Sequence, residues 1–213
     1  SYDPAVRQNE WALRNRFDSC EVFGKTLLII GLGRIGRHLL GFARAFGMNV
    51  LAYDPGLAST TIADLGAMPV ATLAEGLNRA DFISLHAPKS DHQPLIGKAE
   101  LSLMKPTAYL VNTARGGMID EIALVHALET KALAGAGLDV FTDEPPAHDH
   151  ALFRRHDVIL TPHIASLTAD SAIQMALRSI GNVIDYFDGR LNPDLVVNRD
   201  AIGIDHVNFK PMS

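Results

Sequence analysis

Short apolar runs alternate with longer amphipathic stretches along most of this chain. Apolar runs of about four to eight residues are typical of strands buried on both faces of a sheet, and apolar residues at helical spacing indicate helices. Strands that alternate with helices predict an α/β fold with a doubly wound parallel sheet. We expect strands at 27–30, 50–53, 67–70, 82–85, 108–111, 135–140 and 158–160, and helices at 34–46, 73–78, 98–104, 119–131 and 166–187.

A helix is also expected before the first strand, over residues 2–17, with Pro4 near its start. It has apolar surface but no apolar partner nearby in the sequence. We therefore expect it to cover the edge of the sheet, or to join a neighbouring lobe or subunit. Its apolar residues are Val6, Trp11, Leu13 and Phe17.

Three of the other helices carry clear local signals. Asp120 is the expected N-cap of helix 119–131, and a serine or threonine near its start should cap helix 166–187. Helix 34–46 should present one apolar face, formed by Ile35, Leu39, Phe42 and Phe46.

A glycine motif follows the first strand. Gly31, Gly33 and Gly36 form G-x-G-x-x-G between strand and helix, and the next strand ends on Asp54 about 20 residues later. The first glycine allows a tight turn, the second lets the backbone approach a pyrophosphate, and the third lets helix pack on strand. The helix N-terminus offers N–H groups to phosphate. Together these features predict a Rossmann-type dinucleotide-binding domain.

Asp54 also favours one cofactor. A carboxylate at this position accepts hydrogen bonds from the ribose hydroxyls of an adenosine and repels a 2′-phosphate. No arginine follows it in 55–57. We therefore expect NAD rather than NADP.

Composition narrows the function without identifying it. The 213 residues suffice for one α/β domain with short appendages, and 47% hydrophobic with 20% charged residues is ordinary for a globular protein. A net charge of −5 lacks the excess of positive charge that is typical of nucleic-acid-binding proteins. We find no run long enough for a membrane span and no signal-peptide core in 1–20. Cys20 is the single cysteine, so an intrachain disulfide is excluded. We expect a cytoplasmic enzyme domain.

Titratable residues follow several of the expected strands. Arg115 follows strand 108–111, Asp139 and Glu144 end or follow the next strand, and His163 follows the last. In open α/β sheets, ligands bind beyond the carboxyl ends of the strands, so these residues should meet at one edge. Arginine suits a carboxylate, and a histidine oriented by a glutamate suits proton transfer. Hydride transfer on an α-hydroxy acid needs a group that binds the carboxylate, a group that transfers the proton and a group that orients it.

Other polar residues invite weaker interpretations. His148 and His150 suggest a metal, but no third ligand stands at suitable spacing, so we expect a charged loop and no metal site. His86 is expected to be a loop residue near the cofactor rather than a catalyst. Glu144 alone would be an ordinary solvated acid.

The chain resembles the NAD-binding half of the D-isomer-specific 2-hydroxyacid dehydrogenases, the family that includes D-lactate, D-glycerate and 3-phosphoglycerate dehydrogenases. The resemblance extends from about Phe23 to Asn198. It rests on the blocks GLGRIG, SLHAP, LMKPTAYLVNTARGGMIDE, GAGLDVFTDEPP and ILTPHIAS, in that order.

The resemblance implies specific roles for these residues. Arg115 would bind the substrate carboxylate, His163 would be the general acid/base, and Glu144 would pair with it. Asp139 and the backbone of Thr113 would contact the nicotinamide side. The cofactor-binding residues implied by the resemblance are Gly31, Gly33, Arg34, Ile35, Gly36, Asp54, Pro88, Thr113 and Asp139.

The resemblance also implies what this chain lacks. Family members carry a second lobe that closes over the substrate, and 213 residues leave no room for it. We therefore expect a truncated chain with little activity alone, divided into a connecting helix (1–22), an NAD-binding domain (23–190) and a C-terminal tail (191–213). A homodimer is expected, because in the family this domain supplies most of the dimer interface. The alternatives are a non-catalytic NAD-binding module and a dehydrogenase of the formate or phosphite type.

Overall fold

The computed structural model describes residues 2–16, 19–88 and 93–198. The chain forms two compact units, residues 1–162 and residues 163–213. The first unit contains the sheet, and the second contains one long helix. The expected domain boundaries near residues 22 and 190 stay a prediction.

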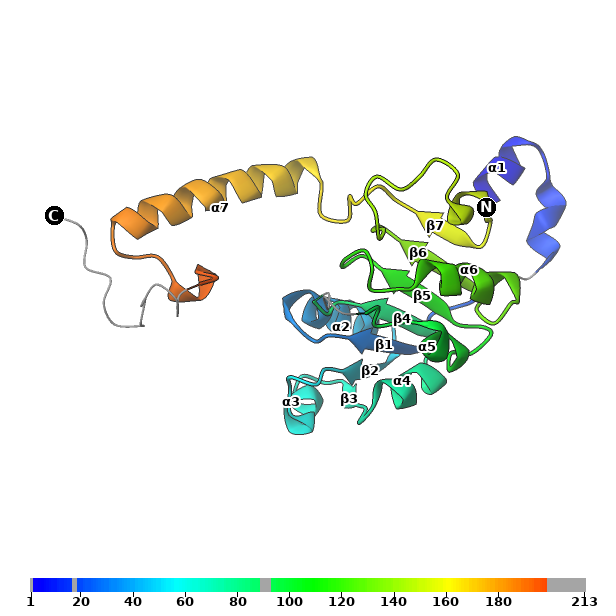
Figure 1. Cartoon of the computed structure of the whole chain (residues 1–213), viewed down its shortest axis with the longest axis horizontal. Coiled ribbons are helices and arrows are strands. Elements are labelled where there is room, and N and C mark those ends of the chain that lie inside the picture. Colours follow the sequence, from blue (N-terminus) through cyan, green and yellow to red (C-terminus); the bar gives the residue numbers. More distant parts are fainter. Residues whose placement is uncertain (1, 17–18, 89–92, 199–213) are drawn as a thin grey trace. The chain divides into compact units, whose positions relative to one another are not determined.

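The described part of the first unit is built on a seven-stranded sheet in the order β3-β2-β1-β4-β5-β6-β7 (Figure 1). Every neighbouring pair of strands is parallel. The prediction of a doubly wound parallel sheet is therefore confirmed. The strands are β1 (Thr26–Ile30), β2 (Asn49–Tyr53), β3 (Met68–Pro69), β4 (Phe82–Leu85), β5 (Tyr109–Asn112), β6 (Gly135–Leu138) and β7 (Val158–Leu160).

Right-handed crossovers decide which face of the sheet each helix covers. The chain steps outward from β1 to β3 through α2 and α3, which share one face. There Leu40 and Ala43 of α2 and Ile62 of α3 join Leu27 and Ile29 of β1 in one apolar core. We call this side of the sheet the α2 face. The two helices are α2 (Arg34–Ala45) and α3 (Ser59–Asp64).

The chain then crosses to the opposite face and steps outward from β4 to β7. Because side chains alternate along a strand, Leu28 and Ile30 point to this second face. They form a larger core with Leu77 of α4, Leu101 of α5 and Leu124 of α6. The helices are α4 (Leu73–Arg79), α5 (Lys98–Ser102) and α6 (Glu121–Glu129), followed by the 3-10 helix η2 (Ala151–Arg154).

Helix α2 leaves most of its expected apolar face exposed, and Leu39 is the residue of that face that packs, partly buried, against the core. Gly36 lies so close to the backbone of Gly31 that the helix cannot rotate, and residues 40 and 43 continue the same stripe one and two turns later. The close approach at the glycine therefore overrides the apolar periodicity. The exposed fractions on the predicted apolar face are 70% for Ile35, 65% for Phe42 and 64% for Phe46.

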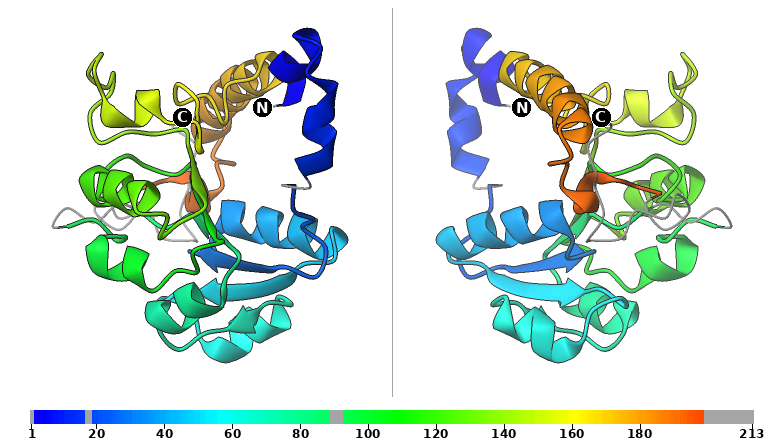
Figure 2. Two further views of the ribbon diagram at one scale, coloured as in Figure 1. Left: turned by 90° about the vertical axis from the view of Figure 1, so that its right-hand side faces the viewer. Right: turned by 90° about the vertical axis from the view of Figure 1, so that its left-hand side faces the viewer.

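The segment over 2–17, predicted to be one helix, forms two shorter ones. It is split into α1 (Tyr2–Arg7) and the 3-10 helix η1 (Trp11–Arg16), with Asn9 between them at a φ of 61°. Asparagine tolerates this left-handed conformation, and short helices without packing partners are marginal. The segment extends away from the sheet (Figure 2). Phe17 lies outside the described residues.

The second unit contains α7 (Ala169–Phe187) and the 3-10 helix η3 (Pro193–Leu195). Thr168 caps α7 by accepting a hydrogen bond from the Ser171 N–H at 3.0 Å, as the sequence predicted. Within the described residues, no helix combines the length and the apolar character that crossing a bilayer would require. The predicted tail beyond residue 198 lies outside the described residues.

Candidate functional site

The glycine turn at the end of β1 gives each glycine a separate function. Gly31 has a φ of +93° and donates its N–H to the Tyr53 carbonyl at 2.9 Å, and a Cβ on it would lie 2.6 Å from the Ala87 nitrogen. Gly33 is exposed, and a Cβ there would meet no atom within 4 Å. A Cβ on Gly36 would overlap the Gly31 carbonyl oxygen. The turn therefore has open space only at its second glycine, where a pyrophosphate would approach.

Asp54 holds this turn from the neighbouring strand. Its Oδ2 accepts the Leu32 N–H at 2.8 Å, and its Oδ1 accepts the Gly56 N–H at 2.9 Å. A carboxylate has about four acceptor positions, so each oxygen keeps capacity for a ribose hydroxyl. The residues that begin α2, Arg34 and Ile35, are exposed beside the turn.

The loop that carries Arg115 is shaped by a residue that the sequence analysis missed. Asn112 ends β5 and is only 2% exposed. Its Nδ2 donates to the Arg115 carbonyl at 2.9 Å, and its Oδ1 accepts the Ala114 N–H at 3.0 Å. The Arg115 and Thr113 side chains remain exposed above the strand end. The only signal in the sequence is a polar residue directly after an apolar run.

Asp139 ties together the ends of three neighbouring strands. It is 2% exposed, its N–H donates to the Asn112 carbonyl at 3.0 Å, and its carboxylate accepts the Thr161 hydroxyl at 2.5 Å. The Thr161 N–H donates to the Leu138 carbonyl at 3.0 Å. Asp139 thus contacts the ends of β5 and β7, but a contact with nicotinamide stays a prediction.

Glu144 lies in the loop after β6 and is exposed. Its Oε1 accepts the Phe141 N–H at 3.0 Å, so the carboxylate folds back on its own loop. The Phe141 carbonyl packs against Gly116, where no side chain would fit. The structure therefore brings the loops of Arg115 and Glu144 into direct contact.

Glu121, the first residue of α6, anchors the same loop and was also missed. Its Oε1 accepts both the N–H and the hydroxyl of Thr142, at 2.7 and 2.9 Å, and its Oε2 pairs with His150 Nε2 at 3.0 Å. The His150 ring packs edge-on against Phe141, with centroids 5.9 Å apart. His150 is thus bound to a carboxylate. Asp120 caps α6 as predicted, accepting the Ala123 N–H at 3.0 Å.

His163 begins the second compact unit. That it lies beside Arg115 and Glu144 stays a prediction. Its side chain is exposed, and its φ is 53°. Residues other than glycine rarely adopt this conformation, which is enriched at active sites. Pro88, expected on the adenosine side, is exposed at the end of its described segment.

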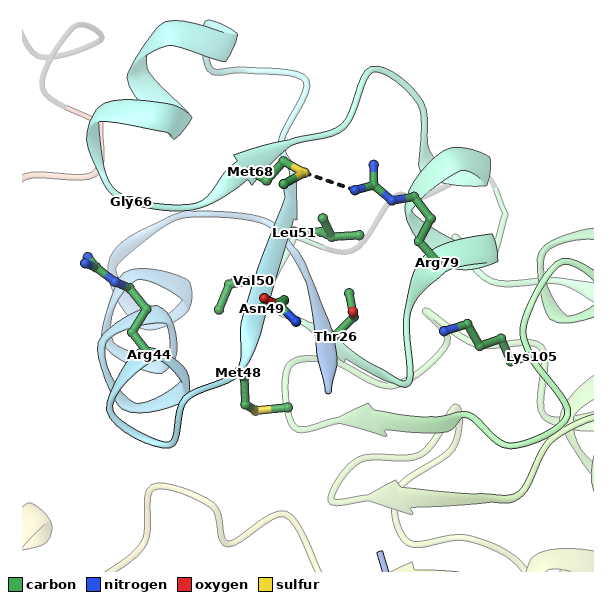
Figure 3. Close-up of a pocket in the computed structure, with 10 residues that line it drawn as sticks. All are labelled: Thr26, Arg44, Met48, Asn49, Val50, Leu51, Gly66, Met68, Arg79 and Lys105. Atoms are coloured by element: carbon green, nitrogen blue, oxygen red, sulfur yellow. Dashed lines mark hydrogen bonds between the residues drawn. The ribbon is translucent and has the colours of Figure 1, made fainter. Parts of the chain in front are cut away.

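A cavity of about 670 Å³ lies at the opposite, amino end of the strands (Figure 3). Two of its basic side chains, Arg44 and Arg79, come from the last turns of α2 and α4, where cations oppose the helix dipole. Arg79 pairs with Glu75 and Lys105 pairs with Asp81, each at 2.8 Å. Ligands bind at the carboxyl ends of such strands, so this cavity is not the predicted site. It is lined by Thr26, Arg44, Met48, Asn49, Val50, Leu51, Gly66, Met68, Arg79 and Lys105.

Comparisons with known proteins identify the family of this chain. The family model described as D-isomer specific 2-hydroxyacid dehydrogenase, NAD binding domain, matches residues 1–165. The chain is 44% identical to a D-3-phosphoglycerate dehydrogenase of Methanocaldococcus jannaschii over 170 residues, which cover 78% of this chain and 32% of the relative. It is 38% identical to a glyoxylate reductase of Aeropyrum pernix over 214 residues, which cover 97% of this chain and 63% of the relative.

A solved structure extends the likeness to the fold. D-lactate dehydrogenase from Aquifex aeolicus, complexed with NAD and lactic acid, superposes with a TM-score of 0.71 at 32% identity, covering 86% of this chain and 61% of that one. The chain thus spans between about a third and two thirds of the length of these relatives. It belongs to the D-isomer specific 2-hydroxyacid dehydrogenase family, of which it contains the NAD-binding domain.

Proposed function

We propose that this chain binds NAD(H) at the glycine turn and forms the cofactor half of a dehydrogenase that interconverts D-2-hydroxy acids and 2-oxo acids. The observation that carries the proposal is the hydrogen bond from the Leu32 N–H to Asp54, which joins the carboxylate that would bind the ribose to the turn that would hold the pyrophosphate. Both parts of a dinucleotide site are thereby fixed relative to each other before a ligand arrives.

The proposed substrate chemistry assigns one function each to Arg115, Glu144 and His163. Bound NAD would accept a hydride from the carbinol carbon. Arg115 would hold the substrate carboxylate through its two-pronged guanidinium. In the oxidation, His163 would take the hydroxyl proton, and in the reduction it would return it. Glu144 would orient the imidazole and stabilise its protonated form.

Cofactor titration tests the proposal directly. We expect NADH to bind more tightly than NADPH by a factor of about ten or more, or at least ~1.4 kcal/mol, because Asp54 repels a 2′-phosphate. Calorimetry with both cofactors measures the difference. Asp54→Asn keeps the size of the side chain but removes its charge, so it should narrow the preference. Equal affinity of the unaltered chain for both cofactors would contradict the proposal.

We further propose that the domain forms a homodimer. The N-terminal segment has apolar side chains without a covering surface among the described residues, with Val6 53% and Trp11 64% exposed around a cavity of about 200 Å³. Exposed apolar patches of this kind mark association sites. Sedimentation at tens of micromolar should detect a dimer if the Kd is about micromolar, and Trp11→Ser should weaken it. The expected cytoplasmic location stays a prediction.

A further inference from the structure

Buried polar side chains in the described chain are concentrated at the carboxyl edge of the sheet. They are Ser84 in β4, Asn112 in β5 and Asp139 directly after β6, with exposed fractions of 7%, 2% and 2%. Burying a polar group costs free energy unless it gains a hydrogen bond. Asn112 shapes the Arg115 loop, and Asp139 holds the end of β7. Ser84 has a comparable bond, but to a residue without an assigned function.

The partner of Ser84 is His86, at a hydrogen-bond distance of 2.8 Å between Oγ and Nε2. Ser84 pairs in register with Ile29, which belongs to the α2 face. Side chains two apart on a strand share a face, so Ser84 and His86 both lie on the side where α2 packs. The His86 N–H donates to the carbonyl of Ile30, the last residue of β1, at 2.7 Å, so the pairing with β1 continues one residue beyond the end of β4.

This position is the point where the strand order reverses. The chain leaves β1 toward β2 on one side, whereas β4 lies on its other side. A crevice at such a point is where dinucleotides bind in open α/β sheets, with pyrophosphate at the N-terminus of the helix after β1. The backbone of His86 also lies directly against Gly31, the first residue of the glycine turn.

The chemistry of the pair suits an anionic ligand. Serine can donate or accept, so either tautomer of His86 is compatible with the bond to Nε2. Burial lowers the pKa of His86, so its ring is neutral at neutral pH and carries one N–H. Among the described residues, Nδ1 of His86 has no hydrogen-bond partner. With Ser84 donating to Nε2, the ring proton is on Nδ1 and available to an oxygen of a ligand.

We propose that His86 is a cofactor-binding residue that donates its Nδ1–H to the pyrophosphate of the bound dinucleotide, and that Ser84 is the positioning residue that orients its ring. This inference rests on the proposed NAD(H) binding.

Three substitutions of His86 separate this function from a structural one. Asn places its amide N–H near the position of Nδ1, Gln places it near Nε2, and Leu has neither. We expect H86L and H86Q to weaken ADP-ribose and NADH binding by about 10- to 100-fold, the usual loss for a hydrogen bond to a charged group. H86N should retain affinity within about threefold of the unaltered chain. The affinity of S84A should lie between that of H86N and that of H86L, because the imidazole ring remains but is no longer oriented.

Adenosine, which lacks phosphate, is the control ligand. Its affinity, measured by NMR titration, should be the same in the unaltered chain and all four variants. H86N binding ADP-ribose as weakly as H86L, or all variants losing adenosine as strongly as ADP-ribose, would overturn the proposal in favour of a purely structural pair. If the unaltered chain bound NADH and the variants bound it equally well, only the inference about His86 would be wrong. If the unaltered chain did not bind NADH, the proposed function itself would fail, and this inference with it.

Discussion

Three glycines of the same helical segment should respond differently to alanine. Gly36 has no space, because a Cβ there would overlap the Gly31 carbonyl oxygen, which belongs to the backbone and cannot rotate away. Gly33 and Gly41 both have open space, with no atom within 4 Å of the added Cβ. Gly33 faces the position of the expected pyrophosphate, whereas Gly41 lies in the middle of α2 on its exposed side.

The expected magnitudes follow from these positions. Gly36→Ala should lower the free energy of unfolding by about 1–3 kcal/mol, the usual cost of overpacking, and should also deform the cofactor turn. Gly41→Ala should raise it by about 0.5–1 kcal/mol, because glycine is costly inside a helix. Gly33→Ala should change it by less than about 1 kcal/mol, since its φ of −73° suits alanine.

The affinity for NADH should distinguish Gly33 from Gly41, the two positions that tolerate alanine. Urea denaturation gives the stabilities, and calorimetric titration with NADH gives the affinities. Gly33→Ala should weaken NADH binding by at least about tenfold because its methyl group prevents close approach of the phosphates, whereas Gly41→Ala should leave the affinity unchanged. Normal NADH binding by the Gly33 variant would refute the assigned position of the pyrophosphate. A Gly36 variant as stable as the Gly41 variant would refute the packing argument.

Three further outcomes are expected. Asn112→Ala should lower the free energy of unfolding by about 1–3 kcal/mol in urea denaturation, because it leaves the Ala114 N–H and the Arg115 carbonyl without their bonds. Although burial alone would raise the pKa of Asp81, hydrogen bonds from Lys105 and the Thr26 N–H lower it below its ordinary value. Its stabilising effect is therefore present above the ordinary carboxyl pKa and lost as the pH falls through the lowered one. Asp81→Asn should thus be destabilising at pH 7 in the same assay, and the destabilisation should disappear once the pH lies below the lowered pKa. In a complete enzyme containing this chain, His163→Asn should reduce turnover of D-2-hydroxy acids by roughly two to four orders of magnitude, and an unchanged rate would exclude His163 as the acid/base.

The sheet could be predicted because each of its strands is a local apolar run. Helix α3 was missed because only Ile62 is buried in it, so it has almost no apolar periodicity. The apolar pattern did not show which face of α2 packs on the sheet, because the phenylalanines dominate the pattern, whereas the packing of Gly36 on the turn decides the rotation of the helix. Glu121 was missed because spacing along the sequence does not show a hydrogen bond across 21 residues. Asn112 was missed because a single polar residue after an apolar run does not show that its side chain bonds the backbone of the next loop residues.

The two edges of the sheet use polar residues for opposite purposes. At the amino edge, Arg44 and Arg79 lie in the last turns of α2 and α4, where their charges oppose the helix dipoles. The positive charges of the arginines and the partial negative charges of the helix ends compensate each other, so that edge has little tendency to attract an anion. At the carboxyl edge, the first turn of α2 has no side-chain cap, since its N-cap residue is Gly33. The N–H groups of that turn therefore keep their partial positive charge for a ligand, because a capping serine or aspartate would compete with a phosphate for the same donors. Buried polar residues support this edge from below by fixing the loops around it, so the free energy of folding maintains a geometry that binding can use without further ordering.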